Sequence, residues 1–354
     1  AGYEVARDTW NDVALEIYHD KKHGTNIKAL LKTVKVSLDY LTREFAPYPY
    51  PSFKIIEHPV YHAAAHPPFG TADYPEVLGF ITDNSRSHGL DFATIHELSH
   101  QWWGGMAYGA RMRGRQMLNE SLAQYSTLMI FKESFGSGFA GQVARSFQDS
   151  YLKARRAETH AERPLIETDD QEYISYGKGP LVFYALQDAI GEDQVNRALR
   201  NYLHKFAFKA APFPTSRDVV IELRAVAGEH HQELITDLFE KVILYDFQID
   251  QVDVQPSGDV YDVSIILTAQ KFEADGQGKE TKVPLDVDVD IALFSQSDTG
   301  GKSRLPVHQV KRRVTTGIQT IAVQVADMPA AVEIDPFYKL IDRTRQNNSM
   351  KIDR

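Results

Sequence analysis

Apolar residues recur every three to four positions through most of the first two thirds of the chain, which is the period of amphipathic helices. The clearest segment covers residues 25–45, where Asn26 is suited to the start of a helix and Pro47 follows its end. Similar patterns predict helices near 89–104, 117–134, 137–157, 179–190, 193–207, 216–227 and 231–244. This part of the chain is therefore predicted to be mostly helical.

After Tyr245 the period of the apolar positions changes from that of a helix to two residues, which is the period of a strand. Over residues 283–293, apolar positions alternate with aspartates, as in a strand with one buried and one solvated face. Residues 260–267 and 321–325 also have a strand pattern, and segments rich in turn-forming residues separate these strands. We therefore predict a β-sandwich in this region.

The length of 354 residues is enough for about two domains, each with its own core. The predicted fold class is α+β with several domains. We assign a single strand without a partner to 1–18, a helical domain to 19–246, the β-sandwich to 247–340 and a polar tail to 341–354. The strand is interpreted as the remainder of an upstream β domain. The first residue is Ala1 rather than Met, and we expect a piece of a longer protein.

Composition narrows the classes of function. A net charge of -9 and a pI near 5.8 provide no basic field for a phosphate backbone, so no nucleic-acid partner is expected. The absence of cysteine excludes thiolate metal sites, a cysteine nucleophile and disulfides. No apolar stretch approaches the ~20 residues that a membrane helix needs, so this chain is expected to be a soluble fragment. Its oligomeric state is not indicated by the sequence.

Two histidines four residues apart carry the most specific chemical signal. His96-Glu97-Leu98-Ser99-His100 lies within a predicted helix, where residues i and i+4 face the same way and both imidazoles can bind one metal ion. A helix face with two histidines and a glutamate is costly to bury unless a cation compensates it. Two imidazoles and one carboxylate, with a fourth position for water, form a catalytic zinc site. The sequence therefore predicts zinc and one further, anionic ligand.

The sequence around this motif resembles that of a known family. The segment His96–Gly104, followed by Leu118-Asn119-Glu120, is similar to the gluzincin aminopeptidases, the family of the membrane alanyl aminopeptidase and of leukotriene hydrolase. Their signature is H-E-x-x-H-x18-E. The resemblance implies a mostly α-helical, thermolysin-like catalytic domain that holds one Zn²⁺ per chain. It assigns zinc binding to His96, His100 and Glu120, and the role of general base to Glu97.

The third ligand departs from that signature by one residue. Residues 101–119 separate His100 from Glu120, so strict counting selects Asn119 instead. We favour Glu120 because a carboxylate partly neutralises the cation, and because the L-N-E text aligns it with the family's glutamate. The extra residue is expected in the glycine-rich loop over 104–114.

The longer spacing has a second implication. Together with the continuation Asn119-Glu120-Ser121-Leu122-Ala123-Gln124-Tyr125, it resembles the peptidase portions of bacterial proteins fused to ABC-type permease segments. This resemblance implies that the full-length protein has membrane-embedded segments and is associated with a bacterial membrane.

Glu97 is predicted to act on water. At position i+1 it projects about 100° around the helix from His96, toward a water on the metal rather than toward the metal itself. Zinc lowers the pKa of such a water to about 7. The carboxylate of Glu97 can then accept a proton as the water attacks a carbonyl, and pass it to the leaving amine.

Two further residues are assigned by the resemblance. The segment Tyr176-Gly177-Lys178-Gly179 is similar to the family's Y-x-K-G, whose tyrosine stabilises the oxyanion, and Tyr173 is the alternative. The segment 73–81 corresponds to the family's G-x-M-E-N, of which it retains the glutamate, Glu76, but not the Gly, Met or Asn. Glu76 and Glu120 are therefore expected to hold the amine of a peptide substrate.

The sequence thus predicts a zinc-dependent metallopeptidase that acts on peptides, most simply an aminopeptidase. Loss of most of the G-x-M-E-N text leaves an endopeptidase or another hydrolase on the same site as an alternative. A second alternative is a non-catalytic, zinc-containing module that binds peptides and is associated with a membrane transporter.

Overall fold

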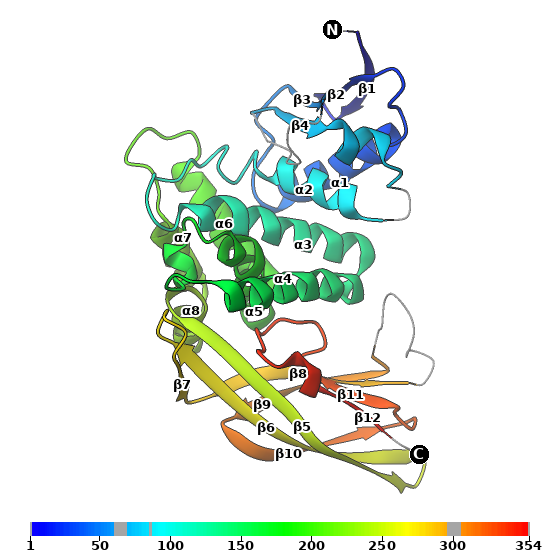
Figure 1. Cartoon of the computed structure of the whole chain (residues 1–354), viewed down its shortest axis with the longest axis vertical. Helices are drawn as coiled ribbons and strands as arrows, with labels where there is room; N and C mark the ends of the chain where they lie inside the picture. Colours follow the sequence, from blue (N-terminus) through cyan, green and yellow to red (C-terminus); the bar gives the residue numbers. More distant parts are fainter. Residues whose placement is uncertain (1, 60–68, 85–86, 296–305, 353–354) are drawn as a thin grey trace. The chain divides into compact units, whose positions relative to one another are not determined.

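The computed structural model describes residues 2–59, 69–84, 87–295 and 306–352 (Figure 1). Contacts between residues divide the chain into two compact units. The first contains residues 1–130 and 192–227, and the second contains residues 131–191 and 228–354. The H-E-x-x-H motif lies in the first unit, and the β pattern lies in the second.

The first unit contains a sheet of four strands, counted over its described residues, in the order β1-β2-β3-β4. Strands β1 and β2 are antiparallel, whereas β2, β3 and β4 run parallel to one another. The strands are β1 (Tyr3–Trp10), β2 (Val13–Asp20), β3 (Ser52–His58) and β4 (Thr71–Pro75). The helices are α1 (Ile27–Glu44), η1 (Val77–Ile81), α2 (Gly89–Ser99), η2 (Met117–Ser121), α6 (Glu192–Phe206) and α7 (Ser216–Val226). Helix α3 (Leu122–Phe135) begins in this unit.

The single unpaired strand expected over 1–18 is instead a hairpin that belongs to this sheet. Strand β1 pairs with β2 along its whole length, and Asn11 makes the tight turn between them at a φ of 47°. Strand β2 pairs in turn with β3. The sequence pattern missed β1 because that strand has no buried residue, so no apolar alternation marks it.

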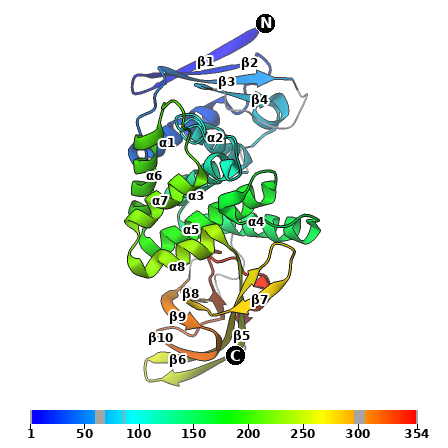
Figure 2. The same ribbon diagram turned by 90° about the vertical axis from the view of Figure 1, so that its left-hand side faces the viewer.

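Helices α1 and α2 pack against each other on one face of the sheet (Figure 2). The buried positions of α1 include Leu30, Val34, Leu38 and Leu41, which are spaced three and four residues apart as predicted. Helix α2 buries nearly every residue of its last two turns. It ends at Ser99, five residues before the predicted end, because the backbone N–H groups of Gln101 and Trp102 donate to residues three positions back, Leu98 and Ser99.

In its described residues, the second unit combines helices with two antiparallel sheets, ordered β10-β6-β5 with β7 on β6, and β12-β11-β8-β9. These sheets form the predicted β-sandwich. The strands are β5 (Val242–Ser257), β6 (Val260–Ala274), β7 (Glu280–Val283), β8 (Asp286–Phe294), β9 (His308–Thr315), β10 (Gly317–Val325), β11 (Ala331–Ile334) and β12 (Ser349–Lys351). The helices are α4 (Ser137–Ala157), η3 (Leu165–Glu167), η4 (Tyr173–Lys178), α5 (Gly179–Ile190), η5 (Glu229–His231), α8 (Gln232–Ile235), η6 (Thr236–Glu240) and η8 (Arg345–Asn347).

Two boundaries of this unit differ from the predictions. The helix expected over 231–244 ends at Glu240, and Val242 begins β5, because an apolar run that is buried on all sides has no period that distinguishes helix from strand. The tail expected over 341–354 contains β12, and its Asp342 is fully buried. The carboxylate of Asp342 accepts a hydrogen bond from the backbone N–H of Phe247 at 2.8 Å, which fixes the tail to the sandwich.

None of the helices in the described parts of the chain combines the length and the apolar character needed to cross a lipid bilayer.

Candidate metal centre

Helix α2 and the turn that follows it position the two histidines. His96 lies in the last turn of α2, and His100 caps the helix, with its backbone N–H donating to the His96 carbonyl at 3.3 Å. The helical spacing brings the two rings together, with centroids 4.7 Å apart. The Nε2 atoms of the two rings are 3.2 Å apart. Both imidazoles therefore present the same nitrogen to one point.

A glycine turn orients the ring of His100. Gly104 has a φ of +92°, and a Cβ on Gly105 would lie 2.4 Å from the Gln101 carbonyl oxygen, so neither position accepts a side chain without strain. The turn places the Trp103 carbonyl oxygen 3.2 Å from His100 Nδ1. A hydrogen bond from Nδ1 to this carbonyl leaves Nε2 as the free ligand nitrogen, which is the usual support of a metal-binding histidine.

Glu120 reaches the two histidines from the π-helix η2. A π turn holds about one residue more than an α turn, and such turns occur often at functional sites. The additional residue between His100 and Glu120 can therefore be accommodated at the start of the helix that carries Glu120, and not only in the glycine-rich loop where it was expected. Asn119, which strict counting selects, lies instead beside Gly104.

His96, His100 and Glu120, here called the metal triad, have the spacing of tetrahedral ligands. Glu120 Oε2 is 3.4 Å from the Nε2 atom of each histidine, and the two nitrogens are 3.2 Å apart. A tetrahedron with bonds of about 2.0–2.1 Å to its centre has edges of roughly 3.3–3.4 Å, so these atoms fit one zinc-sized ion. Glu120 Oε2 is also buried without a hydrogen bond from the described residues. Such an oxygen is suited to a cation.

The charges of the metal triad depend on one another. Burial by itself raises the pKa of Glu120, but the two imidazoles outweigh this effect and hold its pKa well below its usual range. Burial lowers the pKa of His96. For His100 burial acts in the same direction, but contact with Glu120 outweighs it and raises the pKa. The triad therefore contains one carboxylate whose charge a shared cation can neutralise.

Glu97 is buried beside the metal triad and is electrostatically distinct from Glu120. Burial raises the pKa of Glu97 to about 7, and the negative charges of Glu120 and Asp73 add to this effect against the opposing charge of His100. Asp73 lies on β4 and pairs with His58, whose Nε2 is 3.3 Å from its carboxylate. Sequence reasoning missed Asp73, because only the fold brings β4 near α2.

Glu76, the predicted amine anchor, belongs to a different group. Its carboxylate lies within 4.8 Å of ligand atoms of His23 and Glu57, and we call these three residues the His23 group. Glu57 pairs with His23 Nδ1 and accepts a hydrogen bond of 2.6 Å from the backbone N–H of Asp20. The group gathers at the carboxyl ends of the parallel strands β2, β3 and β4. The sequence gives no sign of it, since its members lie far apart along the chain.

Tyr176 and its alternative, Tyr173, lie in the second unit, on the π-helix η4. Tyr173 stacks on Tyr151 with a centroid distance of 5.8 Å, and its hydroxyl accepts a hydrogen bond of 3.5 Å from Gln171 Nε2. Tyr176 is partly buried. Tyr173 is therefore engaged in an internal network of the second unit.

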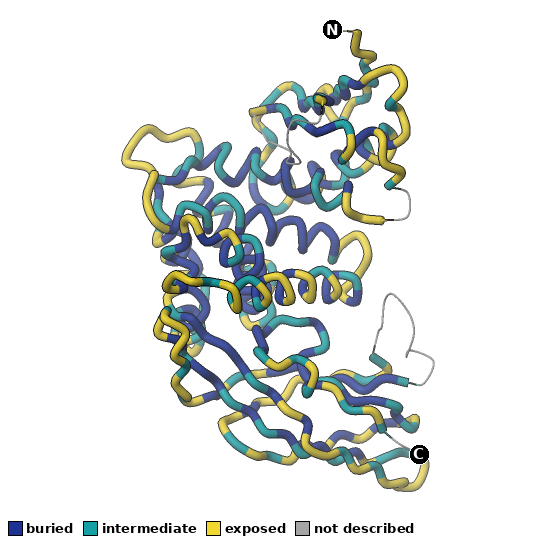
Figure 3. Tube along the Cα trace, viewed as in Figure 1, coloured by how far each residue is buried: buried dark blue, intermediate teal, exposed yellow. Residues whose placement is uncertain are grey.

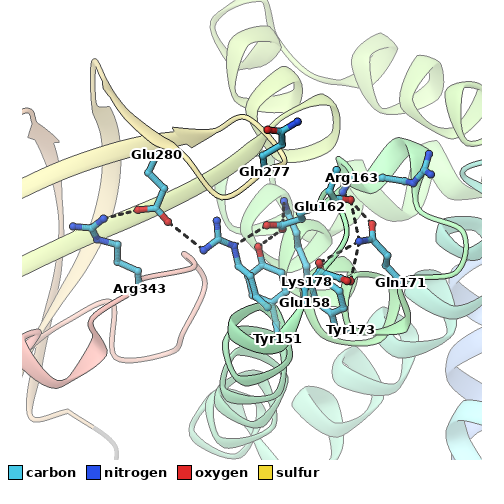
Figure 4. Close-up of polar contacts among 12 residues, drawn as sticks. Tyr151, Glu158, Glu162, Arg163, Gln171, Tyr173, Lys178, Gln277, Glu280 and Arg343 are labelled. Carbon is cyan, nitrogen blue, oxygen red and sulfur yellow. Dashed lines mark hydrogen bonds and ion pairs between the residues drawn. The ribbon is translucent and has the colours of Figure 1, made fainter.

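The helix η4 is fixed by a buried cluster within the second unit (Figure 4). Glu162 accepts hydrogen bonds from the hydroxyl of Tyr151 and from Arg155 Nε, and Lys178 Nζ lies 3.9 Å from the same carboxylate. Burial lowers the pKa of Lys178. A Cβ on Gly177 would lie 2.9 Å from Tyr151 Cβ, so this glycine lets η4 approach α4 closely. Lys178 and the glycine at the x position of the Y-x-K-G segment, Gly177, thus have structural roles.

Comparisons with known proteins agree with this geometry. A family model described as "Peptidase family M1 domain" matches residues 29–239, which include the metal triad. The chain is similar to "Probable aminopeptidase 1" of Sulfurisphaera tokodaii, with 29% identity over 51% of this chain and 24% of the relative. It is similar to "Aminopeptidase M1-B" of Oryza sativa subsp. japonica, with 24% identity over 84% of this chain and 36% of the relative.

A solved structure resembles the fold. The crystal structure of Legionella pneumophila aminopeptidase A in complex with aspartic acid superposes with a TM-score of 0.63 at 13% identity. The match covers 96% of this chain and 38% of the Legionella chain. The chain thus spans well under half the length of these relatives.

Proposed function

Because the chain belongs to peptidase family M1, we propose that it is a zinc-dependent aminopeptidase, which hydrolyses the N-terminal peptide bond of peptides and holds one Zn²⁺ per chain. The observation that carries this proposal is the metal triad, whose three ligand atoms lie 3.2–3.4 Å apart. Zinc, when bound by His96, His100 and Glu120, supplies a Lewis acid that polarises a carbonyl and lowers the pKa of water.

Glu97 is the proposed general base. Its carboxylate is buried beside the triad, and a pKa raised to about 7 matches the range in which a base both accepts and releases a proton near neutral pH. Glu97 takes a proton from the water that attacks the peptide carbonyl. It then gives that proton to the nitrogen of the leaving amine, so no net proton remains on the enzyme.

Tyr176 is the proposed donor to the oxyanion. Its phenolic O–H donates a hydrogen bond to the negative oxygen that forms as the carbonyl is attacked. The buried cluster of Glu162, Tyr151 and Lys178 supports this role because it fixes the helix that carries Tyr176. A donor held in place before the reaction stabilises the oxyanion without reorganisation.

Glu76 and Glu120 are the proposed anchors of the substrate's ammonium group. Asp73 is the alternative to Glu76. Its negative charge acts on Glu97, whereas Glu76 acts on His23, so Asp73 is the acidic residue of this segment that is electrostatically coupled to the base. Replacement of Glu76 and of Asp73, one at a time, distinguishes the two. The variant that lacks the true anchor has a higher KM for peptides with free N-termini and an unchanged KM for blocked peptides.

A peptide digest tests the proposed function. Zinc-loaded protein is incubated with a peptide library, half with free and half with acetylated N-termini, and the products are read by mass spectrometry with a chelator control. We expect stepwise, chelator-sensitive loss of residues from free N-termini alone. Cleavage of both halves would establish an endopeptidase, and cleavage of neither despite bound zinc would favour a peptide-binding module.

We also propose that the full-length protein has membrane-embedded segments and is associated with a bacterial membrane. The support is the similarity of the segment Asn119–Tyr125 to peptidase portions fused to ABC-type permeases. The test is the hydropathy of the complete reading frame. Stretches of ~20 apolar residues outside the present chain are expected, and a frame without them contradicts the proposal.

A further inference from the structure

Two loops of the first unit lie side by side (Figure 1). One covers residues 106–116, between α2 and η2, and the other covers residues 207–215, between α6 and α7. Backbone hydrogen bonds of 2.7 and 2.8 Å join them, from Phe208 to Met106 and from Ala110 to Pro214. The rings of Tyr108 and Phe213 meet edge to face, 5.7 Å apart. These two segments, here called the loop pair, therefore form one connected surface.

The loop pair exposes large apolar side chains. Phe208 is 63% exposed, Met112 is 54% exposed and Phe213 is 43% exposed. All residues from Phe208 to Phe213 are exposed, as the colouring of the α6–α7 loop in Figure 3 shows. A single exposed apolar residue is ordinary, but three on two hydrogen-bonded loops indicate a surface that contacts an apolar phase.

The charge of the loop pair is opposite to that of the whole chain. It contains Arg111, Arg113, Arg115 and Lys209 and no acidic residue, although the net charge of the protein is -9. Arg115 lies over the ring of Tyr108, 5.1 Å from its centroid. The other three basic residues form no ion pair with any described residue. The positive charge is therefore available to an anionic partner.

We propose that the loop pair docks on the surface of an anionic lipid bilayer. The phenylalanines and Met112 enter the boundary between headgroups and acyl chains, and the arginines and Lys209 contact lipid phosphates. This combination of exposed aromatic rings and cations on two projecting loops is complementary to a negatively charged interface. The proposal does not depend on peptidase activity or on any segment outside this chain.

The observations favour a lipid surface over other anionic partners. A nucleic acid requires positive charge along an extended track, whereas the loop pair offers four basic residues on an acidic chain. A stable protein partner requires about 800 Å² of complementary surface on each side. A fluid bilayer needs no rigid partner surface of that size, because it adapts to two short projecting loops.

Vesicle co-sedimentation of the intact chain tests the proposal. The vesicles consist of phosphatidylcholine alone, or of two parts phosphatidylcholine to one part phosphatidylglycerol. We expect binding to the anionic vesicles only, with loss of binding at high salt, because salt screens exposed charges. Each basic residue near an anionic surface contributes roughly fivefold to the partition coefficient. The double variant R111E/R113E is therefore expected to bind more than tenfold more weakly.

Variants that replace the exposed apolar side chains distinguish insertion into lipid from simple attraction between the basic residues and an anion. F208N suits the positive φ of 56° at this residue, and F213S removes the second ring. We expect each variant to bind the anionic vesicles severalfold more weakly while its salt dependence is retained. Poly-aspartate serves as an anionic partner without an apolar phase, and it is expected to bind weakly and to be insensitive to F208N.

Matched substitutions elsewhere provide the controls. K21E/K22E makes the same change of charge at two exposed residues of the same unit, and I318N replaces an apolar residue that is 77% exposed. Both are expected to bind vesicles like the wild type. Absence of wild-type binding, equal loss in the controls, or poly-aspartate binding as strong as that of vesicles would each overturn the proposal.

Discussion

Among its described residues, the first unit contains two groups of histidine and glutamate, and each has its three ligand atoms within 4.8 Å of one another. They are the metal triad and the His23 group. Their compositions differ by one residue, a second histidine in the triad and a second glutamate in the other. The two groups differ in whether their buried carboxylate oxygens already have hydrogen-bond partners.

In the His23 group the buried carboxylate is already satisfied. One oxygen of Glu57 pairs with His23, and the other accepts the backbone N–H of Asp20 at 2.6 Å. In the metal triad, Glu120 Oε2 is buried without a hydrogen bond from the described residues, at equal distances from two ring nitrogens. Residue types alone suggest two metal sites, but the hydrogen bonds indicate one metal site and one structural ion pair.

The secondary-structure elements that carry the two groups differ as well. Two members of the triad share one helix end, so their spacing follows from helical geometry. The His23 group is assembled from the ends of three strands, and its Glu57 joins the turn after β2 to the end of β3. We therefore expect chemistry to depend on the triad, and stability to depend on the pair of His23 and Glu57.

The largest expected effect follows removal of the proposed base. The substitution Glu97→Gln should lower kcat by about 10²–10⁴-fold while zinc content stays the same, because the amide cannot accept a proton. Peptide hydrolysis and metal analysis on the same sample measure both quantities. Glu57→Gln is the matched control, since it makes the same chemical change at a buried glutamate of the same unit and should leave kcat unchanged. Unchanged hydrolysis by the Glu97 variant would remove this residue from the mechanism.

The next effect is on metal content. The substitution His100→Ala should lower zinc affinity by more than the roughly 10–100-fold that loss of an outer-shell partner causes, because it removes a ligand. Metal titration followed by elemental analysis measures this. His23→Ala is the control and should keep one zinc per chain. If His23→Ala also lost zinc, or if the wild type bound two ions, the distinction between the two groups would be wrong.

A smaller effect concerns stability. The substitution Glu57→Gln should lower the free energy of unfolding by about 1–3 kcal/mol, because it leaves the N–H of Asp20 and the ring of His23 without their charged acceptor. Urea denaturation measures this. Glu76→Gln should cost less, since Glu76 acts on His23 only through its charge. An equal loss in the two variants would show that Glu57 has no special structural role.

The same contrast explains what the sequence could predict. The two histidines of the triad lie within one helical turn, so local spacing predicts that they share one metal ion. Spacing alone selects Asn119 as the third residue, and the choice of Glu120 needed its charge and the L-N-E resemblance. Asp73 and the His23 group come from strand ends that are distant along the chain, and only the sheet order brings them together. Strand β1 and the tail strand β12 were missed because short or exposed strands have no apolar alternation.

The smallest expected effect is a pH dependence of the stability that the Glu57→Gln variant loses. The hydrogen bond to Glu57 raises the pKa of His23, so the folded protein holds the His23 proton more tightly than the unfolded chain, where histidine titrates near ~6.5. The stabilisation is therefore complete below about pH 6.5 and is lost as the pH rises through the folded-state pKa. The difference in unfolding free energy between wild type and Glu57→Gln should be larger at about pH 6 than at about pH 9. In a His23→Asn background the difference should no longer change with pH over this range. A difference that persisted there would mean that another titrating group, and not the pair of His23 and Glu57, connects the turn after β2 to the sheet.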